Sequence, residues 1–443
     1  MTEFRPEAKR VAFFSIGAVG HVHPTLAIVR ELVLRGCAVE YYAHEPFRAA
    51  IEEAGACFRP YVVDGARVDD VLAFVRSCNP TRSAPLCVQP AAVRLLPALV
   101  RAASAAGRRP DVCCHDLLAP WGAYLARRLG VPAVCFSVTV LNDDDHVATL
   151  AGAGDRPNET NARAIAALRE DYGVATRWED AMCTFSRTTL VLLPEEFQPA
   201  FSSRTPRAAF RFVGQVVNAR RSLCQSAAWD DFARACRERA RAASRVVFVS
   251  MGTTVVADAR FWRVVRRAFG ADPDALVVCA LGSSASDEMA AQCPPNTLWA
   301  ASVPQLEVLA LAHVFVTQAG MNSVLEALLA GVPMVCLPHF GDQPGIANAV
   351  QDLGAGLMVD PLDAGRLLRD SVYAVLSDPA YARAAKGLGD RLAASSGASA
   401  AAELILDELD EGAVAREAGT DESARNKKTG PGLVAAPPDR GRA

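Results

Sequence analysis

The 443-residue chain has little lysine and no long apolar run. Only four of its 46 basic residues are lysines, and with 49 acidic residues the formal net charge is −3. A basic surface for nucleic acid is therefore not indicated, and we expect no nucleic-acid partner. No stretch of 18 or more apolar residues occurs, and the charged start of the chain disfavours a signal peptide. We therefore expect a cytoplasmic protein without integral membrane association.

Several ligand-binding motifs are also missing. The 13 cysteines are scattered without a CxxC pair, which is typical of reduced core thiols. No GxxxxGK[ST] loop occurs, and GAVGHV at 17–22 is not GxGxxG, so a P-loop NTPase and a simple NAD enzyme are disfavoured. His21 and His23 could form a pair of metal ligands, but no third or fourth ligand accompanies them. We therefore expect neither a metal site nor a cofactor.

Strand-like apolar runs alternate with segments of helical periodicity in both halves of the chain. VAFFSI at 11–16, a helical segment that ends at Gly36 and AVEYYA at 38–43 form a strand–helix–strand unit. Residues 143–185 show no clear period and are predicted to be irregular. The remaining pattern predicts strands at 111–114, 132–137, 190–194, 210–214, 245–250, 275–281, 313–317 and 333–338, and helices at 119–129, 303–312, 321–331, 342–354, 361–376 and 378–394.

This alternation predicts an α/β protein with two doubly wound, Rossmann-like parallel-sheet domains that face a central cleft. Ligands of such sheets bind beyond the carboxyl ends of the strands, so the chemistry should lie in the turns that follow them. The expected parts are an N-terminal domain at 1–220, a charged linker at 221–244, a C-terminal domain at 245–412, whose last helices could pack back on the first domain, and a disordered tail at 413–443.

Two segments of the first half suggest acid–base chemistry. In GAVGHVHP, Gly17 and Gly20 allow a tight turn near a ligand, and His21 follows at the start of the next helix. A histidine there can act as a general base because its ordinary pKa lies near neutral pH. Asp116 ends a later strand and could orient such an imidazole. The alternative for Asp116 is a cap on the helix at 119–129, and for the histidines a polar cap.

The second half suggests a site for a nucleoside diphosphate. In TQAGMNSVLEALLAG a strand meets a glycine, and Asn322 and Ser323 open a helix whose backbone N–H groups can bind phosphate. Glu326 follows one turn later and could accept hydrogen bonds from sugar hydroxyls. SMGTT at 250–254 is a second loop of small donors, and Asp342 with Gln343 could bind vicinal hydroxyls. Ordinary helix capping by Asn322, Ser323 and Asp342 is the alternative.

Taken in order, GHVHP, HD, SMGT, VPQ, TQAGMNS, E and DQ resemble the bacterial macrolide-type glycosyltransferases. These enzymes belong to the UDP-glycosyltransferase superfamily and have the GT-B fold. The resemblance covers about residues 8–410, and the block 303–357 is its most specific part. It implies an inverting hexosyltransferase of antibiotic biosynthesis. Such an enzyme moves a sugar from UDP or dTDP to a hydroxyl of a small hydrophobic acceptor, such as a polyketide, without a metal.

The resemblance also implies roles for single residues. His21 matches the base and Asp116 the acid that orients it, whereas His23 stands where the family often has asparagine. The implied donor-binding residues are Ser250, Gly252 and Thr253 beside the diphosphate, Val303 and Gln305 at the nucleotide base, Gln318, Gly320, Asn322 and Ser323 in the phosphate-binding turn, Glu326 at the ribose, and Asp342 and Gln343 at the donor sugar.

Two positions depart from the family pattern. Gln318 stands where the family usually has a histidine that contacts the diphosphate, and an amide can donate a hydrogen bond there but cannot carry a positive charge. Ser302 stands where an aromatic ring often stacks on the nucleotide base, with Trp299 three residues earlier. Weaker donor binding, or a changed donor, is therefore expected.

Two other functions stay open at this point. The first is a lipid-directed or cell-envelope glycosyltransferase, for which the Arg-rich stretches at 203–221 and 233–245 would form a basic patch. The second is a partner protein that keeps the fold with weak or no turnover, which Gln318 would allow. The acceptor should be framed by the loops around 65–90 and 140–185. The sequence leaves a homodimer open.

Overall fold

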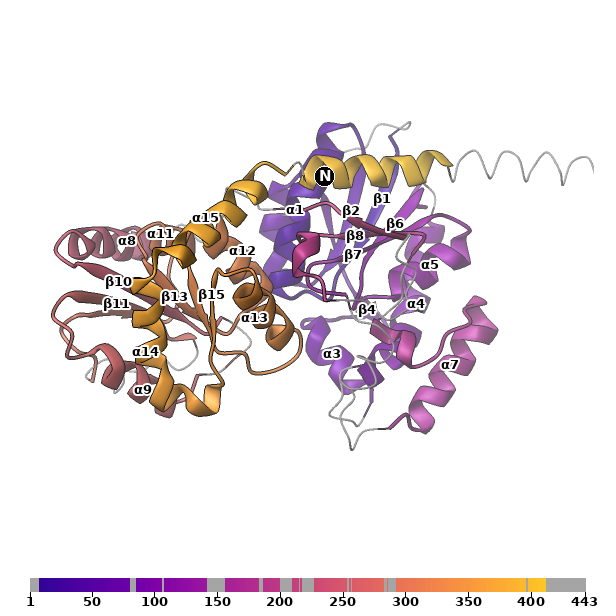
Figure 1. Cartoon of the computed structure of the whole chain (residues 1–443). Helices are drawn as coiled ribbons and strands as arrows, with labels where there is room; N and C mark the ends of the chain where they lie inside the picture. The colour runs from indigo at the N-terminus through magenta and orange to yellow at the C-terminus, as the bar shows by residue number, and fades with distance from the viewer. Residues whose placement is uncertain are drawn as a thin grey trace, which may run out of the picture.

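The computed structural model describes residues 8–79, 85–105, 107–141, 156–182, 186–199, 209–214, 216, 227–252, 255, 257–282, 285, 292–395 and 397–411. These residues form two parallel sheets, each covered by helices (Figure 1), which confirms the predicted α/β architecture of two Rossmann-like domains. The expected tail at 413–443 lies outside the described residues. The domain boundaries stay a prediction.

The N-terminal sheet has seven strands in the order β3-β2-β1-β6-β7-β8-β9, all paired in parallel. Their bounds are β1 Arg10–Phe14, β2 Ala38–Ala43, β3 Cys57–Pro60, β6 Val112–Asp116, β7 Ala133–Ser137, β8 Thr188–Val191 and β9 Phe210–Phe212. Two short strands, β4 Val62–Val63 and β5 Ala66–Arg67, form a separate hairpin. The helices are α1 Val19–Leu34, α2 Arg48–Glu53, α3 Val71–Ser77, α4 Pro85–Ser104, α5 Trp121–Leu129 and α7 Glu159–Tyr172, with 3₁₀ turns η1 Glu45–Phe47, η2 Glu179–Met182 and η3 Glu195–Phe197.

The C-terminal sheet has six strands in the order β12-β11-β10-β13-β14-β15, again all parallel. Their bounds are β10 Arg245–Ser250, β11 Ala275–Ala280, β12 Thr297–Ala300, β13 Val314–Thr317, β14 Met334–Cys336 and β15 Gly356–Met358. The helices are α8 Ala227–Ala240, α9 Ala259–Phe269, α11 Gln305–Leu309, α12 Met321–Leu329, α13 Gln343–Asp352, α14 Ala364–Ser377 and α15 Pro379–Ala393, with the 3₁₀ turn η6 Pro361–Asp363.

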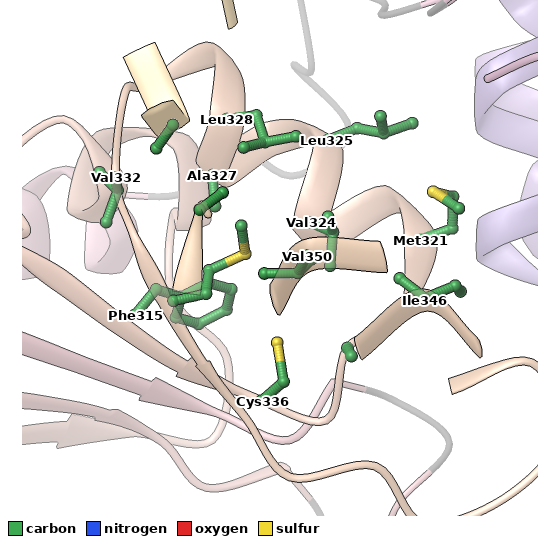
Figure 2. Packing of buried hydrophobic residues seen from close by; sticks show 14 of the residues in the cluster. Phe315, Met321, Val324, Leu325, Ala327, Leu328, Val332, Cys336, Ile346 and Val350 are labelled. Carbon is green, nitrogen blue, oxygen red and sulfur yellow. The ribbon is translucent and has the colours of Figure 1, made fainter. Parts of the chain in front are cut away.

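Helix α12 is held against the sheet by its apolar face. Figure 2 shows the labelled side chains of α12 and α13 gathered over Phe315 of β13 and Cys336 of β14. Val324 and Leu328 are fully buried in this cluster. Burial of such side chains stabilises each by roughly 1.5–3 kcal/mol, so the start of α12 is fixed at the carboxyl end of β13.

Two sequence predictions are wrong in detail, whereas the linker at 221–244, which contains α8, stays a prediction. Residues 143–185 are not wholly irregular, because α7 begins after Asn158, whose side chain forms a capping box with Asn161. The turn expected in GAVGHVHP is shorter than predicted, because helix α1 already begins at Val19 and contains Pro24. A proline within a helix is a poor helix signal, which is why the sequence pattern suggested a longer turn.

The sequence pattern does not predict helix α4 either, because this helix contains two prolines, Pro90 and Pro97. Its segment Leu86–Ser104 is long and apolar enough to cross a membrane by length and composition, although no run of 18 consecutive apolar residues occurs. Within the protein, 61% of that stretch is buried. It contributes Leu95 and Leu96 to an apolar core shared with β1 and α5. The structure therefore uses α4 as a core helix of the N-terminal domain.

The chain returns to the N-terminal domain at its end. The helix at 397–411, yellow in Figure 1, lies along that domain. Its Ile405 and Leu409 join the apolar core around α1 and β2. Thr188 donates a hydrogen bond to Glu408 at 2.5 Å. A further apolar cluster includes Leu141 and Phe197 together with Val324 and Ile346, so the two domains also share buried surface.

Candidate active site

The predicted catalytic pair is assembled by two neighbouring strands. Strands β1 and β6 pair in parallel with Phe14 opposite His115, so the segments that follow them lie at one edge of the sheet. His21 Nδ1 lies 2.7 Å from Asp116 Oδ2. Asp116 Oδ1 accepts the backbone N–H of Leu118 at 2.8 Å. Asp116 does not cap α5, whose N-cap is Pro120, so the carboxylate is left to orient the imidazole.

The environment of His21 favours its charged form. Burial lowers its pKa, but the charge and hydrogen bond of Asp116 and the charge of Asp342 outweigh that effect, so the pKa is raised above 6.5. Its side chain is 19% exposed, against 2% for Asp116. An imidazole that is partly open, with a buried carboxylate behind it, can accept a proton from a bound molecule.

His23 and His115, which also lie near this edge, have different surroundings. His23 packs against Phe47, with ring centroids 5.9 Å apart. His115 is fully buried, and burial lowers its pKa to about 4. His115 Nδ1 lies 3.0 Å from the carbonyl of Asp116, so Nδ1 carries the proton and Nε2 accepts from Ser186 Oγ at 3.1 Å. Only His21 of these three histidines contacts the Asp116 carboxylate.

Neighbouring strands also assemble the second half of the site. Strand β13 pairs with β10 and β14, with Thr317 opposite Ser250 and Cys336, so the three following turns share one edge. Ala319 lies in the left-handed region with φ +64°, which costs a residue with a side chain about 1–2 kcal/mol. Gly320 is the N-cap of α12 and supplies no side-chain cap. The first N–H groups of α12 are therefore without a capping side chain, an arrangement suited to an anion.

Gln318 lies between two glycines of this edge. Its amide nitrogen occupies the space that a side chain at Gly252 would need, and a Cβ at Gly320 would lie 3.3 Å from it. Gly252 itself has φ +65°, which favours glycine. Gln318 is almost fully buried. Its amide is therefore packed at the uncapped start of α12. Thr253, the other residue predicted beside the diphosphate, lies outside the described residues.

Glu326 and Gln305 form a polar pair beside the same helix. Gln305 Nε2 donates to Glu326 Oε2 at 2.6 Å and to Ser323 Oγ at 3.2 Å. Val303, two residues earlier, is buried. Ser302 is exposed, and Trp299 packs against the core cluster around Trp262 rather than standing free. The structure thus brings Gln305, Ser323 and Glu326 into contact, with Val303 nearby in the chain, and their roles in donor binding stay predictions.

Asp342 and Gln343 lie at the start of α13, after β14, and their side chains make different contacts. Asp342 is the N-cap residue of α13 but makes no capping hydrogen bond, and its Oδ2 accepts from Thr139 Oγ1 of the N-terminal domain. Gln343 is buried, and its Oε1 accepts the backbone N–H groups of His339 at 2.8 Å and Phe340 at 3.3 Å. Gln343 therefore holds the loop that presents Asp342.

Among the residues that the structure describes, two hydrogen bonds cross between the domains at this site. Thr139 donates to Asp342, and Asn322 Nδ2 donates to the carbonyl of Gly20 at 3.0 Å. The sequence motifs did not single out Thr139, although its position just after β7 is the signal that could have identified it. In the described part of the chain, no group of three His, Cys, Asp or Glu is arranged to hold a metal ion.

Comparison with known proteins agrees with this geometry. Residues 171–390 match the family described as UDP-glucoronosyl and UDP-glucosyl transferase. The oleandomycin glycosyltransferase of Streptomyces antibioticus is 31% identical over 410 residues, which cover 90% of each chain. The NDP-glycosyltransferase YjiC of Bacillus licheniformis is 29% identical over 403 residues, 90% of this chain and 97% of the relative.

Solved structures of glycosyltransferases are also similar to this chain. The glycosyltransferase of kitacinnamycin is 30% identical with a TM-score of 0.75, over 91% of this chain and 100% of the other. The calicheamicin glycosyltransferase CalG4 is 25% identical with a TM-score of 0.70, over 91% and 99%. These two-sheet structures confirm the GT-B arrangement. The chain belongs to the UDP-glucoronosyl and UDP-glucosyl transferase family, and it is a glycosyltransferase.

Proposed function

We propose that this enzyme transfers a sugar, with inversion, from a UDP- or dTDP-sugar to a hydroxyl of a small hydrophobic acceptor such as a polyketide. The observation that carries the proposal is the His21–Asp116 pair at the carboxyl ends of β1 and β6. A hydrogen bond from Asn322 to Gly20 places this pair next to the uncapped start of α12 in the second domain. The similar proteins named for oleandomycin and calicheamicin support the acceptor class.

The reaction is a direct displacement. The acceptor hydroxyl attacks the anomeric carbon of the donor sugar, a C–O bond forms there, and the bond from that carbon to the diphosphate breaks. His21 takes the hydroxyl proton as the bond forms. Asp116 keeps the imidazole in one orientation and stabilises its positive charge once it is protonated. The hydroxyl proton thus ends on His21, and the bonding electrons leave with the nucleoside diphosphate.

The leaving diphosphate is received by the second domain. Backbone N–H groups at the start of α12, which no side chain caps, are placed to donate to the developing charge. Glu326 is placed to accept hydrogen bonds from the ribose, with Gln305 bonded to it. Asp342, which is not used as a helix cap, is placed for hydroxyls of the donor sugar.

The described residues offer little for a lipid-directed enzyme. Within the Arg-rich stretch 233–245, Arg237 pairs with Glu307 at 2.7 Å, Arg245 with Asp272 at 3.3 Å, and Arg239 donates to backbone carbonyls. These cations therefore serve contacts within the C-terminal domain. The intact geometry of His21 and Asp116 also favours turnover over a partner protein without activity.

The test is His21→Ala, assayed with the donor that the enzyme accepts. We expect kcat to fall on the order of 10²–10⁴-fold, with nucleotide affinity within about twofold, because the base acts on the acceptor and not on the donor. His23→Asn is the matched control on the same helix and should keep turnover near that of the wild type. An unchanged kcat in His21→Ala would remove His21 from the role of base.

A further inference from the structure

The hydrogen bond between Asn322 and Gly20 joins the two halves of the proposed site. Asn322 lies in the first turn of α12, and its Nδ2 donates to the Gly20 carbonyl at 3.0 Å across the domain boundary. Gly20 directly precedes His21 in the first turn of α1. The contact therefore connects the helix that carries the proposed base to the helix that faces the proposed diphosphate site.

Pro24 explains why the Gly20 carbonyl is available. In an α-helix the carbonyl of one residue accepts the N–H of the residue four positions later, which for Gly20 is residue 24. Proline has no N–H, and α1 runs through Pro24 without ending. The usual helical partner of the carbonyl is thus missing, so the carbonyl can accept a hydrogen bond from another donor. Asn322 supplies it.

The absence of a side chain at residue 20 makes the approach of Asn322 feasible. A Cβ on Gly20 would lie 2.9 Å from Asn322 Nδ2, and no other atom outside its own helix lies within 4 Å of it. Gly20 does not have a positive φ, so its backbone conformation does not require glycine. Among the described residues, the Asn322 side chain is therefore the group that a side chain at residue 20 would displace.

We propose that Gly20, Pro24 and Asn322 form a positioning latch that sets the distance between the base on α1 and the donor site on α12. This inference rests on the proposed function of His21 and of the α12 turn. The Thr139–Asp342 bond crosses the boundary as well, and the buried cluster around Leu141 and Phe197 keeps the domains in contact. Within that contact, the Asn322–Gly20 bond fixes the position of α1 against α12. Misplacement of a reacting group by about 1 Å can cost on the order of 10²-fold in rate.

A double-mutant cycle tests the latch. Gly20→Ala should lower kcat about 10- to 100-fold, because the added methyl group pushes the Asn322 side chain away from the Gly20 carbonyl. The affinity for UDP or dTDP is measured beside kcat in each variant, because the resemblance places Asn322 in the phosphate-binding turn, and a kcat loss that follows a loss of nucleotide affinity would count against the latch. Asn322→Ala removes the same contact. In the Asn322→Ala background, Gly20→Ala should change kcat by less than about twofold. Equal losses in both backgrounds, or no loss in the wild-type background, would overturn the proposal.

A second measurement does not depend on activity. Amide hydrogen exchange of the ligand-free protein should become faster at residues 17–26 and 320–329 in both single variants, because each loses the cross-domain bond. Unchanged exchange in both variants would overturn the latch. If the wild-type protein transfers no sugar, the proposed function is wrong, and hydrogen exchange is then the measurement that tests the latch. If His21→Ala abolishes transfer but Gly20→Ala does not affect it, only the latch fails.

Discussion

Asp116 is fixed through both of its carboxylate oxygens. Oδ2 contacts His21 Nδ1 and Oδ1 accepts the N–H of Leu118, so the carboxylate has one orientation. The same contact raises the pKa of His21, in spite of its burial. The base must be neutral to accept a proton. At the scale of the single residue, the proposed function therefore predicts that this pair sets the pH dependence of the enzyme.

The rate is expected to depend on pH through His21. For the wild type, kcat/KM should fall as the pH drops through a value above 6.5, because protonation of His21 removes the base. Asp116→Asn removes the negative charge, so this acid limb should move to lower pH while the maximal rate falls by about tenfold or more. The measurement is a kcat/KM profile from pH 5 to 9. An acid limb that stays in place would show that another group controls it.

Gln318 offers a second prediction for a single side chain. Gln318→His should strengthen UDP or dTDP binding by about three- to tenfold below pH 6.5, because an imidazolium at the start of α12 adds a positive charge beside the diphosphate. The gain should be small at pH 8.5, where the imidazole is neutral. Calorimetric titration at the two pH values measures it. Equal affinities of variant and wild type at both pH values would place residue 318 away from the diphosphate.

The sequence singled out individual residues of the proposed site from their places in the pattern. His21 and Asp116 stand at a helix start and a strand end, where the alternating pattern places ligands, and Glu326 lies one turn into α12. Thr139 also follows a strand end, but no motif surrounds it, so its position alone did not single it out. Its bond to Asp342 joins residues 203 positions apart, and only the packing of the two domains brings them together.

At the scale of elements, capping and proline explain where the sequence predictions succeeded and where they did not. The predicted strand at 245–250 and the helix starts at Met321 and Gln343 match the structure closely, because apolar runs and flanking glycines mark them. Helices α4 and α7 are two of those that the pattern did not predict, which also include α2, α3, α8 and α9. Two prolines obscure the first, and the second is amphipathic but strongly charged and depends on the Asn158 cap.

The helix at 397–411 carries its own prediction. Ile405 is buried against the N-terminal domain although it lies far beyond it in the sequence. Ile405→Ala should lower the free energy of unfolding by about 2–4 kcal/mol, because the methyl groups removed leave a cavity. Denaturant unfolding with the matched control Glu403→Ala, at an exposed position of the same helix, measures it. Equal stability of the two variants would show that this helix does not contribute to that core.

At the scale of the whole molecule, the site exists only where two domains meet. The proposed base lies on α1 of the first domain and the proposed donor site at the start of α12 of the second, and the buried cluster around Leu141, Phe197 and Ile346 holds the domains together. Binding of a nucleotide to the folded protein alone should therefore stabilise it.

A panel of nucleotides tests that expectation. UDP or dTDP at about 100 times its Kd should add about 2.7 kcal/mol to the free energy of unfolding and raise Tm, whereas NAD should not. Glu326→Gln is the control, since it removes a carboxylate that the proposal places at the ribose, and its Tm shift should be smaller at equal nucleotide concentration. A shift with NAD alone would contradict the proposed donor class.

The sequence by itself determined the alternation of strands and helices, the two parallel sheets and the residues at the strand ends. These follow from apolar periodicity and glycine positions, which act over a few residues. Only the tertiary structure decided which of those residues meet. His21 and Asp116 meet because β1 and β6 are neighbours, and Asn322 meets Gly20 because two domains pack with Pro24 leaving a carbonyl open. Contacts of this kind depend on the packing of distant elements, which no local pattern encodes.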